Sequence, residues 1–156
     1  MTITNPADIV AYYVRKGLGL ERNKVFGTGT LLATARLIRT LSEESGVSRH
    51  SIQAFSLGEH GDSSMIPFST VTIGGLPFDE YDISKEKVLE ATRQIGMTII
   101  EGKKSTEFGI GRALTEMAAC ILRDEKKIMP ASVLLQGEYG QYNVHCGVPC
   151  LIGKNG

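Results

Sequence analysis

The segment Ile52–Ser63 reads Ile-Gln-Ala-Phe-Ser-Leu-Gly-Glu-His-Gly-Asp-Ser, and its place in the chain decides the expected fold. Ile52 to Leu57 is typical of a strand, and Gly58 to Ser63 of a glycine-rich loop that follows it. Two helical patterns precede this segment, and two follow it. Because helices and strands do not alternate regularly, the order predicts an α+β fold with a largely antiparallel sheet packed against long helices.

Two amphipathic helices are expected before the central segment. The first begins at Asn5-Pro6, where asparagine can cap a helix and proline suits its first turn, and Gly17 is its natural end. Its apolar stripe is formed by Ile9, Val10, Tyr13 and Val14. The second helix follows the turn Gly27–Thr30, ends at Gly46, and has an apolar face made by Leu31, Ala35, Ile38 and Leu41.

The second half of the chain contains two further helices and several strands. Ser84 can cap a long helix that runs to about Gly102, and the stretch from Ile110 to Ile121 has the clearest helical period in the chain. The expected strands are Val71–Ile73, which is closed by Gly74-Gly75, and then Ser132–Leu135, Asn143–Cys146 and Pro149–Ile152.

Composition excludes several classes of protein. The chain has 156 residues, 17 Lys+Arg and 17 Asp+Glu, so residues 1–156 fit one neutral domain without the basic excess of a nucleic-acid-binding protein. No apolar run approaches the roughly 20 residues of a membrane span, and we expect no membrane partner. Three cysteines and a start without a secretory signal indicate a reducing compartment, the cytoplasm.

Three residues are candidates for chemistry. His60, in the glycine-rich loop, can exchange a proton near neutral pH, although a surface-loop histidine without a role fits the pattern equally well. Arg36, on the second expected helix, can hold a carboxylate with two parallel hydrogen bonds, or it can be a solvated helix arginine. Asn5 can hold a substrate oxygen or simply cap the first helix.

Other motifs do not reach the standard of a site. Cys146 and Cys150, with His145 adjacent, lack the second ligand pair that zinc requires, so no metal is expected. Gly27 and Gly29 are not a dinucleotide fingerprint, because Leu32 occupies the place of the third glycine. We therefore expect no cofactor-binding residues in this chain.

Several stretches resemble a known family. Leu57–Ser64, followed by Pro67–Ser69, resembles the active-site segment of L-lactate dehydrogenases, and Gly27–Arg36 resembles the helix before it in that family. The other matching stretches are Thr4–Ile9, Ser105–Gly111, Tyr139–Gly140 and Gly147–Pro149. Because they occur in order and at matching spacing, the chain is identified as a member of the lactate/malate dehydrogenase superfamily, most similar to L-lactate and L-2-hydroxyisocaproate dehydrogenases.

The resemblance implies an NAD-dependent hydride transfer that interconverts a 2-oxo acid and an L-2-hydroxy acid. His60 would be the general acid and base, Arg36 would bind the substrate carboxylate, Thr106 would line the side-chain pocket, and Asn5 would bind the substrate oxygen or the surroundings of His60. Glu59 favours the lactate or hydroxyisocaproate type, with malate dehydrogenase as the alternative.

The resemblance covers only the second, substrate-binding half of the family protein. The Rossmann domain that binds most of the NAD is absent from residues 1–156, so we expect the chain alone to be inactive and to self-associate as a homo-oligomer. A non-catalytic carboxylate-binding or oligomerisation module is the competing interpretation.

The sequence also departs from the family pattern. Ala33 stands where the family has an aspartate that stabilises the protonated histidine, so we expect weak catalysis even from a complete enzyme. Ile38 and Gln53 replace the basic pair that binds a sugar bisphosphate in regulated bacterial relatives, so we expect no such activation.

Overall fold

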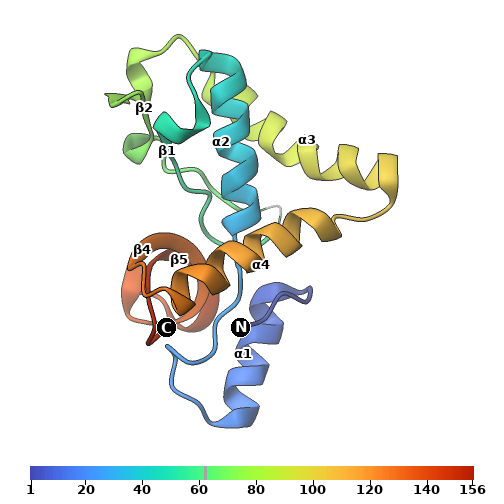
Figure 1. Cartoon of the computed structure of the whole chain (residues 1–156), viewed down its shortest axis with the longest axis vertical. Helices are drawn as coiled ribbons and strands as arrows, with labels where there is room; N and C mark the ends of the chain where they lie inside the picture. Colours follow the sequence, from blue (N-terminus) through green and yellow to red (C-terminus); the bar gives the residue numbers. More distant parts are fainter. Residues whose placement is uncertain (62) are drawn as a thin grey trace.

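The computed structural model describes residues 1–61 and 63–156 and contains helices and strands in the expected order (Figure 1). The helices and strands, in chain order, are α1 Ala7–Leu18, α2 Leu31–Ser45, β1 Ile52–Gln53, β2 Thr72–Ile73, β3 Leu76–Pro77, α3 Lys85–Lys103, α4 Glu107–Leu122, β4 Lys127–Gln136 and β5 Tyr142–Ile152. Strands β1, β2 and β3 form one sheet and β4 and β5 a two-stranded ribbon, and all these pairings are antiparallel. The predicted α+β class is therefore confirmed.

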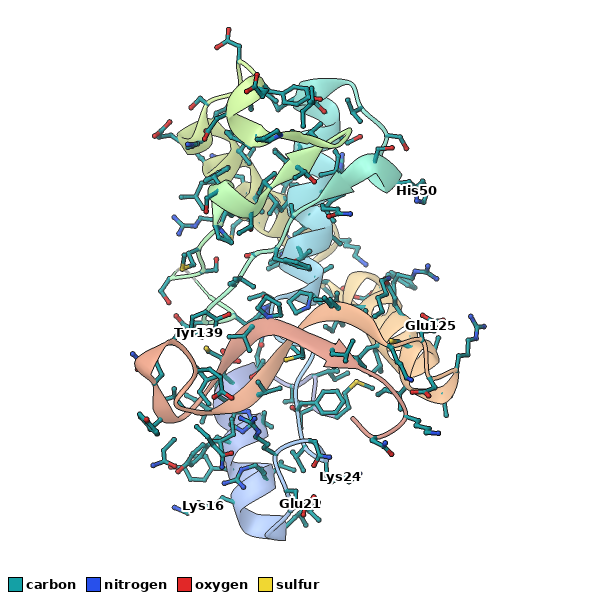
Figure 2. All side chains as sticks on the ribbon, turned by 90° about the vertical axis from the view of Figure 1, so that its left-hand side faces the viewer. Lys16, Glu21, Lys24, His50, Glu125 and Tyr139 are labelled. Carbon is teal, nitrogen blue, oxygen red and sulfur yellow. The ribbon has the colours of Figure 1, made fainter. Side chains whose placement is uncertain are left out.

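Helix α2 connects two hydrophobic cores (Figure 1). Its later turns contribute Leu37 and Leu41 to a core shared with the three-stranded sheet and with Val88 of α3. Its first residue, Leu31, belongs to a second core between α4 and the ribbon, together with Met117. Figure 2 shows the ribbon crossing the molecule between α1 and the three-stranded sheet. Within the described residues, no helix is long and apolar enough to cross a membrane.

Helix α1 differs from its prediction in both its ends and its buried face. Pro6 is the N-cap residue and makes no side-chain cap, and the helix passes Gly17 to end at Gly19, whose φ of 63° is left-handed. The predicted apolar stripe is largely exposed, with Ile9 at 56% and Tyr13 at 64%, whereas two small residues of the helix, Ala7 and Ala11, are buried. Because the alanine side chains are small, this face of the helix can approach the ribbon closely.

Helices α2 and α3 agree with their predicted ends. Gly46 ends α2 with a φ of 72°, and the Ser84 hydroxyl caps α3 by accepting a hydrogen bond of 3.2 Å from the Lys87 amide. The predicted face of α2 was partly wrong, because Ala35 is exposed while Leu37 is fully buried. Because α2 packs against two cores, its buried residues do not lie along a single straight stripe of the helix.

The strands differ from their predictions in length. The strand expected at Ile52–Leu57 is regular only at Ile52–Gln53, and the two strands expected near the C-terminus form the single strand β5. Pro130 and Pro149 are direct cross-strand partners in the ribbon. Proline is tolerated there because each strand of a two-stranded ribbon has a free edge.

The start of α2 is held against β4 by a close backbone approach. Gly27 and Ser132 exchange two backbone hydrogen bonds, each 2.9 Å long. Gly29 has a φ of +48°, and a Cβ atom added to it would lie 2.6 Å from the Ser132 nitrogen. Glycine is therefore required at position 29 for both its backbone angle and its lack of a side chain.

We predict that Gly29→Ala destabilises the chain by about 2 kcal/mol or more, because it combines steric overlap with an unfavourable backbone angle. Gly111→Ala is the matched control. Gly111 lies inside α4 with no atom within 4 Å of an added Cβ, and we expect a gain of about 0.5–1 kcal/mol there. Urea unfolding of both variants measures this difference, and equal effects would contradict the steric argument.

A histidine in β5 is buried without a hydrogen-bond partner. His145 is 8% exposed, and neither of its ring nitrogens has a partner among the described residues. The Tyr12 ring of α1 contacts it edge-on at a centroid distance of 6.0 Å. Burial lowers the pKa of His145 below its ordinary value, and the positive charge of Arg15 lowers it further. The Ser132 backbone and the Asp8 carboxylate raise this pKa, but their effect is smaller than that of burial.

We predict that acidification destabilises the chain through His145. The unfolded chain takes up a proton near pH 6.5 that the folded chain resists, so stability is lost as the pH falls below about 6.5. His145→Gln should flatten this dependence, whereas His50→Gln, at an exposed position, should leave it unchanged. Urea unfolding at pH 7.5 and pH 5.5 tests the prediction. An unchanged pH dependence in His145→Gln would be inconsistent with it.

Candidate active site

Arg36 lies on α2 and is half-buried against α3. A Cβ atom added to Gly96 of α3 would lie 2.8 Å from the Arg36 Nη1 atom, so glycine at position 96 makes room for the guanidinium. Burial lowers the pKa of Arg36 below its ordinary value, yet arginine stays charged at neutral pH. Sequence reasoning missed Gly96, because nothing in the local pattern shows which residue of α3 faces α2.

The Arg36 side chain is not neutralised by the described residues. Its Nε atom is shielded from solvent and has no hydrogen-bond partner there, and no described ion pair includes it. Two neighbouring cations differ in this respect, since Arg39 pairs with Glu43 at 2.7 Å and Lys103 with Glu107 at 3.4 Å. A desolvated and unsatisfied guanidinium is well suited to bind an anion.

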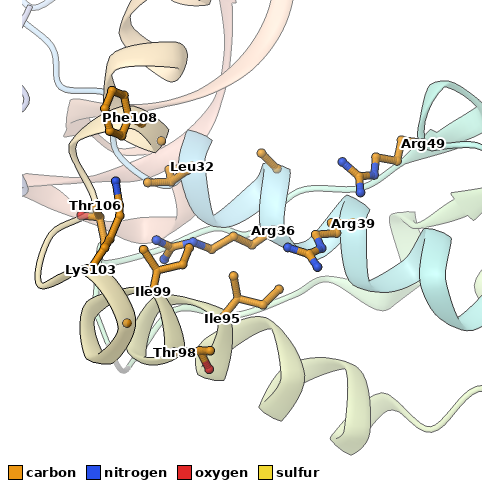
Figure 3. A pocket seen from close by; sticks show the side chains of 13 residues that line it. Leu32, Arg36, Arg39, Arg49, Ile95, Thr98, Ile99, Lys103, Thr106 and Phe108 are labelled. Carbon is orange, nitrogen blue, oxygen red and sulfur yellow. The ribbon is translucent and has the colours of Figure 1, made fainter.

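Arg36 lines a cavity of about 500 Å³ between α2, α3 and the start of α4 (Figure 3). Thr106, the N-cap residue of α4, lines the same cavity. Figure 3 shows the Arg36 guanidinium between Leu32 and Ile99, pointing toward Thr106. The apolar side chains of the cavity are Leu32, Ala35, Ile95, Ile99 and Phe108. The cavity also contains Arg49 and a second threonine, Thr98, and Arg36 is the lining cation whose Nε atom is shielded without a described partner. Cations and hydroxyls beside an apolar wall suit a small acid with an apolar side chain.

His60 lies in a loop that is attached to other elements through its backbone. Gly58 and Gly147 of β5 exchange backbone hydrogen bonds of 2.8 and 2.7 Å at the start of the loop. The His60 amide donates a 3.0 Å hydrogen bond to Oδ2 of Asp8 in α1. His60 is not among the residues that line the Arg36 cavity. The structure thus brings Arg36 and Thr106 together, and it holds His60 beside the first turn of α1.

Asn5 precedes α1 and is exposed. It does not cap the helix, so the cap interpretation of this residue was wrong. Asn5 is not among the residues that line the Arg36 cavity, and Asp8, three residues later, is the residue that binds the His60 amide. The roles of Asn5, Arg36, His60 and Thr106 stay predictions.

Sequence reasoning missed the contact between Asp8 and the His60 amide. The position of Asp8 in a first helical turn was visible, but it gave no sign of a partner 52 residues away.

The three positions that depart from the family pattern carry no charge in the structure. Ala33 of α2 supplies no carboxylate, Ile38 packs against the core of the three-stranded sheet, and Gln53 is exposed. Among residues 1–61 and 63–156, no three His, Cys, Asp or Glu side chains lie close enough to hold a metal ion.

Comparisons with known proteins identify the family of the chain. The model of the lactate/malate dehydrogenase, alpha/beta C-terminal domain, family matches residues 30–156. L-lactate dehydrogenase of Fusobacterium nucleatum is 43% identical over 165 residues, which cover 100% of this chain and 52% of that protein. L-lactate dehydrogenase of Mycoplasma pneumoniae is 44% identical over 159 residues, covering 98% of this chain and 51% of that protein.

Solved structures show the same fold. The crystal structure of minor L-lactate dehydrogenase from Enterococcus mundtii in a ligands-bound form has a TM-score of 0.94 and 34% sequence identity, and the match covers 99% of this chain and 52% of that one. The chain thus spans about half the length of the relatives it matches. With the family model matching residues 30–156, the chain belongs to the lactate/malate dehydrogenase family and corresponds to its C-terminal domain.

Proposed function

We propose that this chain is the substrate-binding half of an NAD-dependent L-2-hydroxyacid dehydrogenase of the lactate type. The observation that supports the proposal most directly is the unpaired, half-buried Arg36 in a cavity that also contains Thr106. The reaction is the interconversion of a 2-oxo acid and an L-2-hydroxy acid. The names of the relatives at 43% and 44% identity support this reaction class.

Arg36 binds the substrate carboxylate in this proposal. Its guanidinium can donate two parallel hydrogen bonds, and partial burial strengthens them because water competes less. A carboxylate held there fixes the substrate relative to the α2 and α3 helices. The substrate side chain then extends along the wall formed by Leu32, Ile99 and Phe108, with Thr106 at its side.

His60 exchanges the proton at the substrate oxygen. A protonated imidazole donates a proton as the carbonyl is reduced, and the neutral form accepts one in the reverse direction. Asn5, which precedes the helix that holds the His60 amide, donates a hydrogen bond to that oxygen or to the His60 loop. Ala33 offers no carboxylate to stabilise the protonated imidazole, so we infer that this step is slow.

The two glycines of the Gly27–Thr30 turn are not available to a dinucleotide. The Gly27 backbone is hydrogen-bonded to the Ser132 backbone. The space beside the Gly29 Cα atom, where a side chain would lie, is occupied by that same backbone. We therefore propose that NAD, which supplies or accepts the hydride when bound, is held mainly by the half of the relatives that this chain does not span.

The surface of the chain supports assembly with further copies. Phe108 and Leu122 of α4 are 77% and 85% exposed, and the cross-strand partners Ile128 and Leu151 of the ribbon are also exposed. Large exposed apolar side chains are typical of interfaces, and we propose a homo-oligomer. The described cysteines, Cys120, Cys146 and Cys150, are free, which supports our placement of the protein in the reducing cytoplasm.

Two observations favour a second function. His60 does not line the Arg36 cavity, and Ala33 removes a carboxylate from α2. A module that binds a carboxylate without catalysis would have these features. Calorimetry of the chain with oxamate tests binding in both cases. An activity assay after the chain is joined to the N-terminal half of a relative distinguishes the two functions, because only the dehydrogenase then turns over a 2-oxo acid.

We predict that Arg36 controls substrate use in a complete enzyme. The chain is joined behind the N-terminal half of the Fusobacterium nucleatum relative, and NADH absorbance is followed with pyruvate, 2-oxoisocaproate and oxaloacetate. Arg36→Gln should lower kcat/KM about 30-fold or more, because a desolvated ionic contact is worth at least ~2 kcal/mol. Arg123→Gln, which removes a surface arginine paired with Glu125, should change kcat/KM less than about twofold. Full activity in Arg36→Gln, or NADH oxidation by the chain alone, would contradict the proposal.

We predict that Ala33→Asp raises kcat of the same fusion enzyme by about tenfold or more, since a carboxylate beside the histidine stabilises its protonated form. Ala33→Asn has a similar volume and no charge, so it serves as the control and should give a smaller gain. If neither variant turned over faster than the parent, the missing carboxylate would not be what limits the reaction.

A further inference from the structure

Asp8 joins three segments that are far apart in the sequence. It lies in the first turn of α1 and is partly buried. Its Oδ2 atom accepts the 3.0 Å hydrogen bond from the His60 amide, and its Oδ1 atom accepts a 2.5 Å hydrogen bond from the Ser132 hydroxyl of β4. Both oxygens of one carboxylate are thus used, one toward the His60 loop and one toward the buried strand.

We propose that Asp8 is a positioning residue for His60, an inference that rests on the proposed function. The loop that contains His60 is also held by backbone hydrogen bonds at its two ends. Gly58 pairs with Gly147, and Leu57 exchanges backbone hydrogen bonds of 2.8 and 2.9 Å with Met65. Between these points, the bond to Asp8 attaches the amide of His60 itself to another element of the fold.

One other described contact leaves the loop, because the Arg93 guanidinium of α3 donates a 3.2 Å hydrogen bond to the Ser64 carbonyl near the end of the loop. The remaining side-chain and backbone contacts around His60 stay inside it. The Gly61 amide bonds to the Glu59 carbonyl at 2.9 Å, and the Ser63 hydroxyl donates to the Glu59 carboxylate. Such bonds shape the loop without fixing it to the protein. A hydrogen bond from an amide to a carboxylate is stronger than one between neutral groups, so Asp8 is suited to hold His60 at a defined place.

The chemistry of the two bonds indicates which substitutions separate positioning from charge. Asparagine at position 8 can still accept from the His60 amide through its oxygen, and its amide nitrogen can donate to the Ser132 oxygen. Alanine removes both bonds. Asp8→Asn should therefore keep most of the positioning effect, and Asp8→Ala should lose it.

Asp124 provides a matched control far from the site. Its Oδ1 atom accepts a 3.0 Å hydrogen bond from the Lys154 amide, so it resembles Asp8 in its contact with a backbone amide. Its φ of 53° means that Asp124→Ala also introduces backbone strain. Asp124→Ala should thus lower stability at least as much as a loss of one such bond, without affecting His60.

The test combines hydrogen exchange with kinetics. Exchange of the peptide that contains His60 is measured by mass spectrometry in the full 156-residue chain and in the fusion enzyme. In Asp8→Ala we expect exchange at His60 to quicken about tenfold or more. We also expect kcat to fall about 10–100-fold, while KM for the 2-oxo acid changes less than about twofold, because Arg36 is untouched. Asp8→Asn should restore most of kcat, and Asp124→Ala should retain it.

Two outcomes would overturn the proposal. One is unchanged exchange at His60 in Asp8→Ala, and the other is an equal loss of kcat in Asp124→Ala, which would show a general effect of stability. A fusion enzyme that is inactive in every form would instead refute the proposed function. In that case the exchange measurement still decides whether Asp8 holds the His60 loop.

Discussion

The two backbone hydrogen bonds between Gly27 and Ser132 determine where α2 begins. The chain before α2 lies against β4 like an added strand, and it is also bonded to the N-terminus through Thr2 and Phe26 at 2.9 Å. The segment before α2 cannot accommodate a side chain at Gly29, since the Ser132 backbone occupies that space. This contact therefore fixes the start of the helix that carries Arg36.

The position of α2 makes Arg36 half-buried against α3, where a charge is costly to hold without a partner. Packing of the two hydrophobic cores opposes that cost, because Leu31 and Leu37 of the same helix are buried in different cores. Gly96 then lets the guanidinium lie against the α3 backbone rather than turn out into solvent. The fold thus maintains an unsatisfied cation, and this is the condition under which an anion binds with most effect.

Sequence reasoning succeeded where the cause of a structure is local. Gly46 and Ser84 end and begin helices through their own backbone angle and side chain, and both predictions are confirmed. It failed where the cause is distant. The apolar stripe of α1 gave no information on what would cover Ile9, and the partner of Asp8 lies 52 residues away. For the site, motifs identified Arg36 and Thr106, but only the packing of α2 on α3 shows that the guanidinium is shielded and unpaired.

The two parts of the candidate site depend on different elements. The proposed carboxylate site is formed by α2, α3 and α4, whereas His60 is held by α1 and the β4–β5 ribbon through Asp8 and Gly147. Backbone bonds of this kind fix where the loop lies, but they do not set the rotation of the imidazole or the nitrogen that carries its proton. An aspartate at position 33 would lie one turn before Arg36 on α2, and under the proposed function it would supply that orientation from the helix that carries the carboxylate-binding residue. With Ala33, the chain keeps the position of the proposed proton carrier but lacks the group that would orient it.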